Sequence, residues 1–124
     1  MNRQTITARS GDHELVSIGN YLDEMFGAGS DTAEQTLSML AELKQMLSDE
    51  VVHFVFRKTD GNIREAYGTR VPEIIRRYDS SGAGDGRNPQ RAHSGTFPYF
   101  DIERRAWRCF KVDRFVKIDK DYVI

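Results

Sequence analysis

The spacing of apolar residues changes at residue 51, and this change constrains the fold more than any other feature of the sequence. Over 13–26 and 31–48, apolar side chains recur every three or four residues, as on one face of an amphipathic helix. From 51 to 58 the chain is rich in β-branched and aromatic residues, which alternate as they do in a strand. We therefore predict an α+β fold, with two helices first and strands after them.

The part of the chain after residue 51 is expected to form five short strands. Asp60-Gly61 is the signature of a tight hairpin between strands at 51–58 and 62–70. Three further strands, at 97–102, 106–112 and 115–118, follow a long loop over 79–96. Because closure of a sheet removes exposed strand edges, short hairpin-linked strands of this kind predict a small β-barrel.

Charge is distributed unequally between the two parts, although the net charge is only −1. Residues 1–50, an arm followed by two helices, carry three basic and nine acidic side chains, a net −6. Residues 51–124, the expected barrel, carry 15 basic and 10 acidic side chains, a net +5. This asymmetry favours either a polyanion partner for the basic part or docking of the two parts on each other.

Cysteine content and hydropathy restrict where the chain works. Cys109 is the single cysteine, so the chain cannot form an internal disulfide. No apolar run is long enough to span a membrane, and the start lacks the apolar segment of a signal peptide. We expect a cytoplasmic protein with no membrane partner.

Several segments of the basic part resemble WYL domains. In Phe97–Ile102, Pro98-Tyr99-Phe100 stands in the place of the Trp-Tyr-Leu strand, and Trp107–Phe115 resembles the final run of such domains. The closer similarity, over residues 51–119, is to a second WYL-like family of short bacterial and phage proteins of unknown function. The segments that carry it are Lys58-x-Asp60-Gly61, Arg64–Thr69, Tyr99-Phe100-Asp101 and Trp107-Arg108-x-Phe110.

This resemblance implies an Sm-like, SH3-type β-barrel that serves as a non-enzymatic, regulatory binding module in a phage or mobile-element setting. It implies nucleic acid or a nucleotide-like anion as the ligand. Arginines interleaved with aromatic residues suit such a ligand, since they combine a cationic groove with stacking rings. The candidate ligand-binding residues are Arg64, Tyr67, Tyr99, Trp107, Arg108 and Arg114. The alternative is that the aromatics form the core and the arginines a solvated rim.

Arg108 is the strongest single candidate. Strand alternation places it on the face of Phe110, which predicts a partly buried arginine. A buried arginine needs either an anionic ligand or a carboxylate partner, for which Glu65 and Asp101 are the candidates. Arg64 has the same two interpretations.

Catalytic, cofactor and metal sites are not expected. His13, His53 and His93 are scattered, and no Cys or His spacing fits a zinc site. Cys109 is interpreted as a small core residue, and a Cys109–His53 nucleophile pair is the minor alternative.

Two further features leave alternatives open. Leu37, Leu40, Leu43 and Leu47 form an apolar stripe, which either binds a second copy or a protein partner or is covered by the first helix. The loop 79–96 carries Arg87, Arg91 and His93 among glycines, so it either orders over a bound nucleic acid or is disordered.

Overall fold

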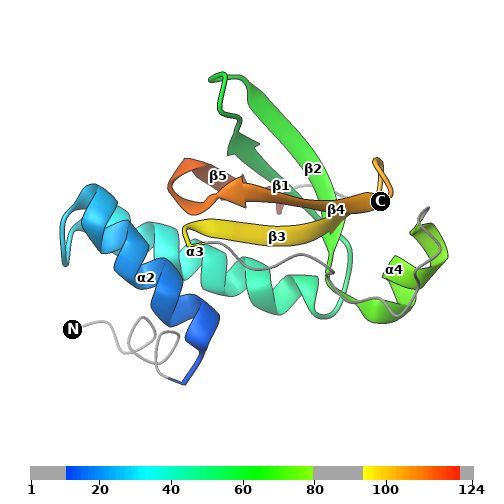
Figure 1. The fold of residues 1–124 in the computed structure, drawn as a ribbon, viewed down its shortest axis with the longest axis horizontal. Helices are drawn as coiled ribbons and strands as arrows, with labels where there is room; N and C mark the ends of the chain where they lie inside the picture. The colour runs from blue at the N-terminus through cyan, green and yellow to red at the C-terminus, as the bar shows by residue number, and fades with distance from the viewer. Residues whose placement is uncertain (1–10, 80–93, 121–124) are drawn as a thin grey trace.

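The structure is a computed structural model that describes residues 11–79 and 94–120. Its elements, in chain order, are α2 (His13–Phe26), α3 (Asp31–Leu47), β1 (Val52–Arg57), β2 (Ile63–Thr69), α4 (Pro72–Tyr78), β3 (Thr96–Asp101), β4 (Ala106–Lys111), the 3-10 turn η1 (Val112–Arg114) and β5 (Phe115–Ile118) (Figure 1). The predicted order of two helices followed by a five-stranded sheet is confirmed.

The sheet is antiparallel, and its strand order is β4-β3-β2-β1-β5. β1 lies between β2 and β5, with His53 opposite Tyr67 and Phe54 opposite Ile118. β2 and β3 pair through two positions, Gly68–Asp101 and Thr69–Phe100. The turn η1 joins the two edge strands, β4 and β5, which do not pair with each other in the described part of the chain. The predicted barrel is therefore open along this seam.

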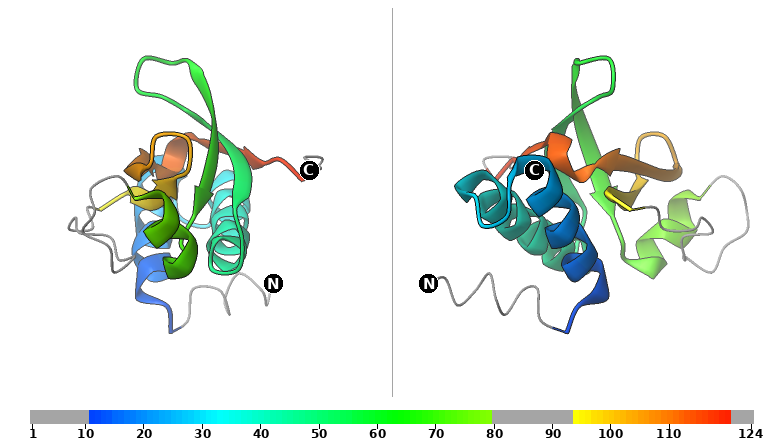
Figure 2. Two further views of the ribbon diagram at one scale, coloured as in Figure 1. Left: turned by 90° about the vertical axis from the view of Figure 1, so that its right-hand side faces the viewer. Right: turned by 60° about the vertical axis from the view of Figure 1, so that its left-hand side comes forward.

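The two helices lie side by side against the sheet, while the β1–β2 hairpin projects beyond it (Figures 1 and 2). Asp12 caps α2 by accepting a hydrogen bond from the Leu15 N–H at 3.0 Å. Ser30 caps α3 in the same way, accepting from the Ala33 N–H at 3.1 Å. These caps fix the first residue of each helix. The apolar side chains of both helices then lie on the faces that pack in the core.

Helices and strands share one hydrophobic core. The leucine stripe of α3, formed by Leu37, Leu40, Leu43 and Leu47, is fully buried at 0% exposure. It packs with α2 and with the aromatic side chains on one face of the sheet, which are Phe54, Phe56, Phe97, Tyr99, Phe110 and Phe115. The first helix and the sheet thus cover the stripe. The alternative in which these leucines bind a second copy or a partner is wrong, since they have no exposed surface to offer.

An ion-pair network joins α2 to the basic part of the chain. Glu14 accepts two hydrogen bonds from the Arg70 guanidinium, both at 2.9 Å, and lies 2.9 Å from the Lys44 ammonium. Burial would raise the pKa of Glu14, but Arg70 and Lys44 together lower it below its ordinary value. The acidic helices do dock on the barrel, and this contact uses one of its arginines, Arg70.

Gly68 and Ala66 lie at a crowded position of β2. A Cβ atom on Gly68 would lie 2.8 Å from Cδ2 of Tyr99 and 3.0 Å from Cε1 of Phe54. Ala66 has no exposed surface. The nearest atoms to such a Cβ on Gly68 belong to aromatic rings of the core.

Candidate functional site

A pocket of about 360 Å³ opens between the β1–β2 hairpin and β4. We call it the basic pocket, because six arginine and lysine side chains line it and none of the described residues that line it is acidic. The six are Arg57, Lys58, Arg64, Arg108, Lys111 and Arg114. The remaining lining residues are Phe56, Thr59, Thr96, Tyr99, Cys109 and Phe110.

Arg64 stands at the wall of the pocket and is held by Asp101. Nη2 of Arg64 donates to Oδ2 of Asp101 at 2.7 Å, and Oδ1 of Asp101 accepts from the Arg104 N–H at 3.0 Å. Asp101 is fully buried, whereas the Arg64 side chain is 20% exposed. Burial would lower the pKa of Arg64, but its hydrogen bonds to Asp101 and Tyr99 raise it. Arg64 therefore stays charged and in a fixed orientation.

Tyr99 forms part of the floor of the pocket. Its ring meets Phe54 edge-on at a centroid distance of 5.0 Å, and only 1% of the residue is exposed. Burial, together with the negative charge of Asp101, raises the pKa of Tyr99 to about 12. The hydroxyl is neutral at physiological pH, and the buried ring offers almost no face for a base to stack on.

Arg108 lies directly opposite Tyr99 in the β3–β4 pairing, on the side of the sheet that faces the pocket. It is exposed, so the prediction of a partly buried Arg108 is wrong; β4 is an edge strand, and the Arg108 side chain lies in solvent. Asp101, one of its proposed partners, pairs with Arg64 instead.

Arg114 lines the pocket from η1. It donates to the Lys58 carbonyl at 3.0 Å, which links η1 to the β1–β2 hairpin. Arg57 donates to the Gly61 carbonyl at 2.9 Å within the same hairpin. These bonds to neutral carbonyls orient the two guanidinium groups without cancelling their charge.

Most of the positive charge in the pocket is not neutralised by the residues that the structure describes. Among the pocket cations, Arg64 pairs with Asp101, and Lys58 lies 3.7 Å from Asp60. The other four form no ion pair with a carboxylate in the part of the chain that the structure describes; they are Arg57, Arg108, Lys111 and Arg114. Such a pocket attracts an anion.

The structure brings Arg64, Tyr99, Arg108 and Arg114 together and leaves out the other two predicted site residues. Tyr67 and Trp107 occupy the other phase of their strands from Arg64 and Arg108, and neither lines the pocket. Tyr67 stacks on His53, with ring centroids 4.5 Å apart, and Trp107 meets the buried Phe100 edge-on at 6.0 Å. Both are packing residues.

Three pocket cations were missed in the sequence analysis, namely Arg57, Lys58 and Lys111. Arg57 and Lys58 lie just before the Asp60-Gly61 turn, and Lys111 follows Phe110. Their positions in the predicted strands place them close to the predicted site residues. Arg87, Arg91 and His93 of the long loop lie outside the described residues.

Cys109 is exposed on β4, so its interpretation as a core residue is wrong. Strands β3 and β2 separate it from His53 on β1, and the structure forms no Cys109–His53 pair.

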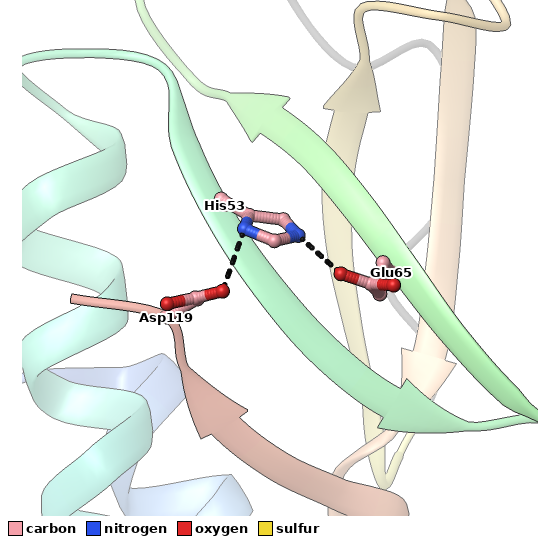
Figure 3. Close-up of side chains that lie close together, drawn as sticks. All are labelled: His53, Glu65 and Asp119. Atoms are coloured by element: carbon pink, nitrogen blue, oxygen red, sulfur yellow. Dashed lines mark ion pairs between the residues drawn. The ribbon is translucent and has the colours of Figure 1, made fainter. Parts of the chain in front are cut away.

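His53 belongs instead to a second cluster, with Glu65 and Asp119, on the far face of β1 and β2 (Figure 3). These three side chains are of the types that can hold a metal ion. The spacing of Cys and His residues in the sequence does not reveal this cluster, because β pairing brings its three members together from distant positions.

Comparison with known proteins gives a consistent result. The profile of the family WYL_2, described as an Sm-like SH3 beta-barrel fold, matches residues 40–116. An uncharacterized 11.5 kDa protein from the Gp31-cd intergenic region of Enterobacteria phage T4 is 31% identical over 88 residues, which are 71% of this chain and 84% of that protein. No solved structure matches the chain significantly. None of the described helices has the length and apolar content needed to cross a membrane.

Proposed function

The chain belongs to the WYL_2 family of Sm-like, SH3-type β-barrels, and from this premise we propose that it is a non-enzymatic, regulatory binding module that holds nucleic acid in its basic pocket. The family and fold predicted from the sequence are confirmed. The observation that carries the proposal is the convergence of six cations on one pocket, four of them without a carboxylate partner among the described residues.

Docking of the acidic helices does not account for these cations. Asp12 and Glu14, at the start of α2, pair with Lys44 and Arg70, and Glu42 of α3 pairs with Lys120 at 2.8 Å. None of these three cations lines the pocket. Because like charges repel in the absence of a counterion, a bound polyanion would relieve a repulsion that the protein leaves in place.

The contacts favour the phosphate backbone over the bases. Guanidinium groups match phosphate oxygens through two parallel hydrogen bonds. The aromatic floor is nearly covered, with Phe56 6%, Tyr99 1% and Phe110 4% exposed, so stacking would add little. We therefore expect binding that tolerates different base sequences and weakens steeply with salt.

A nucleotide-like small anion is the second candidate. The pocket volume of about 360 Å³ falls in the range of small-molecule sites. A mononucleotide could occupy such a pocket alone, whereas an oligonucleotide would extend beyond it along the exposed edge strand.

Binding of labelled single- and double-stranded oligonucleotides to the full chain across a salt series tests the proposal. For single strands, the logarithm of the binding constant should fall by about 0.7 per neutralised phosphate for each tenfold rise in salt. The double variant Arg108→Ala/Lys111→Ala should weaken binding strongly. Its matched control, Arg104→Ala/Lys117→Ala, removes two exposed cations outside the pocket.

Equal losses in the two double variants would mean that total charge, and not the pocket, attracts the nucleic acid. Absence of binding to any oligonucleotide at low salt would refute the nucleic-acid proposal. Competition by a mononucleotide at concentrations near those of the oligonucleotide would favour the second candidate.

A further inference from the structure

Three ionisable side chains converge on the face of the sheet opposite the basic pocket (Figure 3). His53 lies on β1, Glu65 on β2, and Asp119 directly after β5. We call them the outer cluster. The pairing of β1 with both neighbouring strands brings the three residues together. On β2, Tyr67 lies opposite His53, and Glu65 is two residues away from Tyr67. After β5, the Asp119 N–H donates to the His53 carbonyl at 2.9 Å.

Each imidazole nitrogen of His53 has a carboxylate oxygen beside it. Nε2 lies 3.0 Å from Oε1 of Glu65, and Nδ1 lies 3.1 Å from Oδ2 of Asp119. A neutral imidazole carries one N–H and one lone pair, so one of its two nitrogens presents a lone pair to a carboxylate. The His53 side chain is only 4% exposed, and water cannot screen that repulsion effectively. A cation bound by the two carboxylates and by one imidazole nitrogen would remove this repulsion.

The residue types and spacing suit a metal ion. One ligand atom from each residue lies within 4.8 Å of the other two. Around a tetrahedral ion with bonds of about 2.1 Å, ligand atoms are about 3.4 Å apart. A modest side-chain movement closes the difference, and Glu65, with 65% of its side chain exposed, has room to make it.

The ring of His53 is also held in place. Tyr67 stacks on it with a centroid distance of 4.5 Å and an interplanar angle of 8°. Two carboxylates and a neutral imidazole bring a charge of −2, which a divalent cation balances.

We propose that the outer cluster is a binding site for a divalent transition-metal ion of the Zn²⁺ type. Imidazole favours Zn²⁺, Co²⁺, Ni²⁺ and Cu²⁺ over Mg²⁺ and Ca²⁺, which prefer oxygen ligands. Three protein ligands leave a coordination position for water, reached from the exposed side of Glu65. The site is independent of the proposed nucleic-acid function, because it lies on the other face of β1 and β2 and shares no residue with the basic pocket.

Titration of the full chain with ZnCl₂ by calorimetry, and with CoCl₂ by visible absorption, tests the site. We expect one ion per chain, with a Co²⁺ d–d spectrum typical of four or five ligands. Asp119→Asn and Glu65→Gln should each weaken Zn²⁺ binding at least tenfold. His53→Gln should abolish it, and Glu65→Gln serves as the variant that keeps the fold, since its side chain is exposed.

The matched controls are His13→Gln and Asp49→Asn, which alter an exposed histidine and an exposed aspartate elsewhere. Both should bind Zn²⁺ as the unmodified chain does. The proposal would be overturned by the absence of saturable Zn²⁺ or Co²⁺ binding, or by binding that Glu65→Gln and Asp119→Asn leave unchanged. A third result would also overturn it: ¹⁵N chemical shifts of the His53 imidazole that show an N–H on both nitrogens and do not respond to Zn²⁺. The charge of the two carboxylates would then be balanced by a protonated imidazole and not by a metal ion.

Discussion

Replacing Arg64 by methionine separates the structural from the binding role of a pocket arginine. The substitution keeps an apolar stem of similar length but removes the donor that lies 2.7 Å from Asp101. Asp101 has no exposed surface, and its remaining donor is the Arg104 N–H at 3.0 Å. The variant therefore leaves a buried carboxylate short of its counter-charge.

The size of the effect follows from burial. Breaking a buried ion pair by removing one partner costs about 3–5 kcal/mol. Because 20% of the Arg64 side chain is exposed and water reaches that end of the pair, we lower the expectation to about 2–4 kcal/mol. For a domain of this length, a loss of that size lowers Tm by about 10 °C.

Arg108→Met is the matched control. Arg108 also lines the pocket, but it is exposed, and none of the ion pairs among the described residues includes it. Its removal should change the free energy of unfolding by no more than about 0.5 kcal/mol. Both variants remove one cation from the pocket, so each should reduce the salt dependence of nucleic-acid binding by a similar amount.

Urea unfolding followed by circular dichroism measures the stability difference. The two variants should share one m-value and differ in midpoint. Adding Asp101→Asn to Arg64→Met should recover part of the loss, because the amide needs no counter-charge. Unfolding free energies of Arg64→Met and Arg108→Met that agree within about 1 kcal/mol would refute the idea that Asp101 depends on Arg64.

Three further predictions concern packing and pH. Gly68→Ala should cost about 1–3 kcal/mol in urea unfolding, because the new Cβ would lie 2.8 Å from Tyr99 and 3.0 Å from Phe54, and adding Phe54→Leu should reduce that cost. The pKa of Tyr99 is raised to about 12 from 10.0, so its contribution to stability is complete below pH 10.0 and is lost as the pH rises toward 12; tyrosinate absorbance should show a late-titrating component that Tyr99→Phe removes. The lowered pKa of Glu14 means that its stabilising effect is present above its ordinary value of 4.5 and is lost as the pH falls through the folded-state value, so Glu14→Gln should unfold with a shallower acid dependence in pH-dependent melting.

Patterns of neighbouring residues determined the secondary structure. The apolar spacing over 13–26 matches α2, and the alternation that ends near Arg57 matches β1. Asp60-Gly61 marks the β1–β2 turn, where Gly61 has a φ of 90°. Local backbone preference and side-chain period decide such features, so they can be recognised before any tertiary contact is known.

Errors in the site prediction arose where a residue's environment depends on distant segments. Arg108 and Cys109 were expected to be partly or fully buried, but β4 is an edge strand and both are exposed. Tyr67 and Trp107 were grouped with the arginines by sequence proximity, although strand alternation turns them to the other face. Alternation identifies which residues share a face, whereas only the strand order shows which face is covered and by what.

The sequence by itself thus determined the α+β order of elements, the segregation of charge into an acidic and a basic part, and the family. The tertiary structure decided that the leucine stripe of α3 is buried, that Asp101 partners Arg64, and that six cations surround one pocket. It also gathered His53, Glu65 and Asp119 into the outer cluster. The physical reason is that β pairing and helix packing join residues far apart in the chain, and a linear pattern records only the neighbours along it.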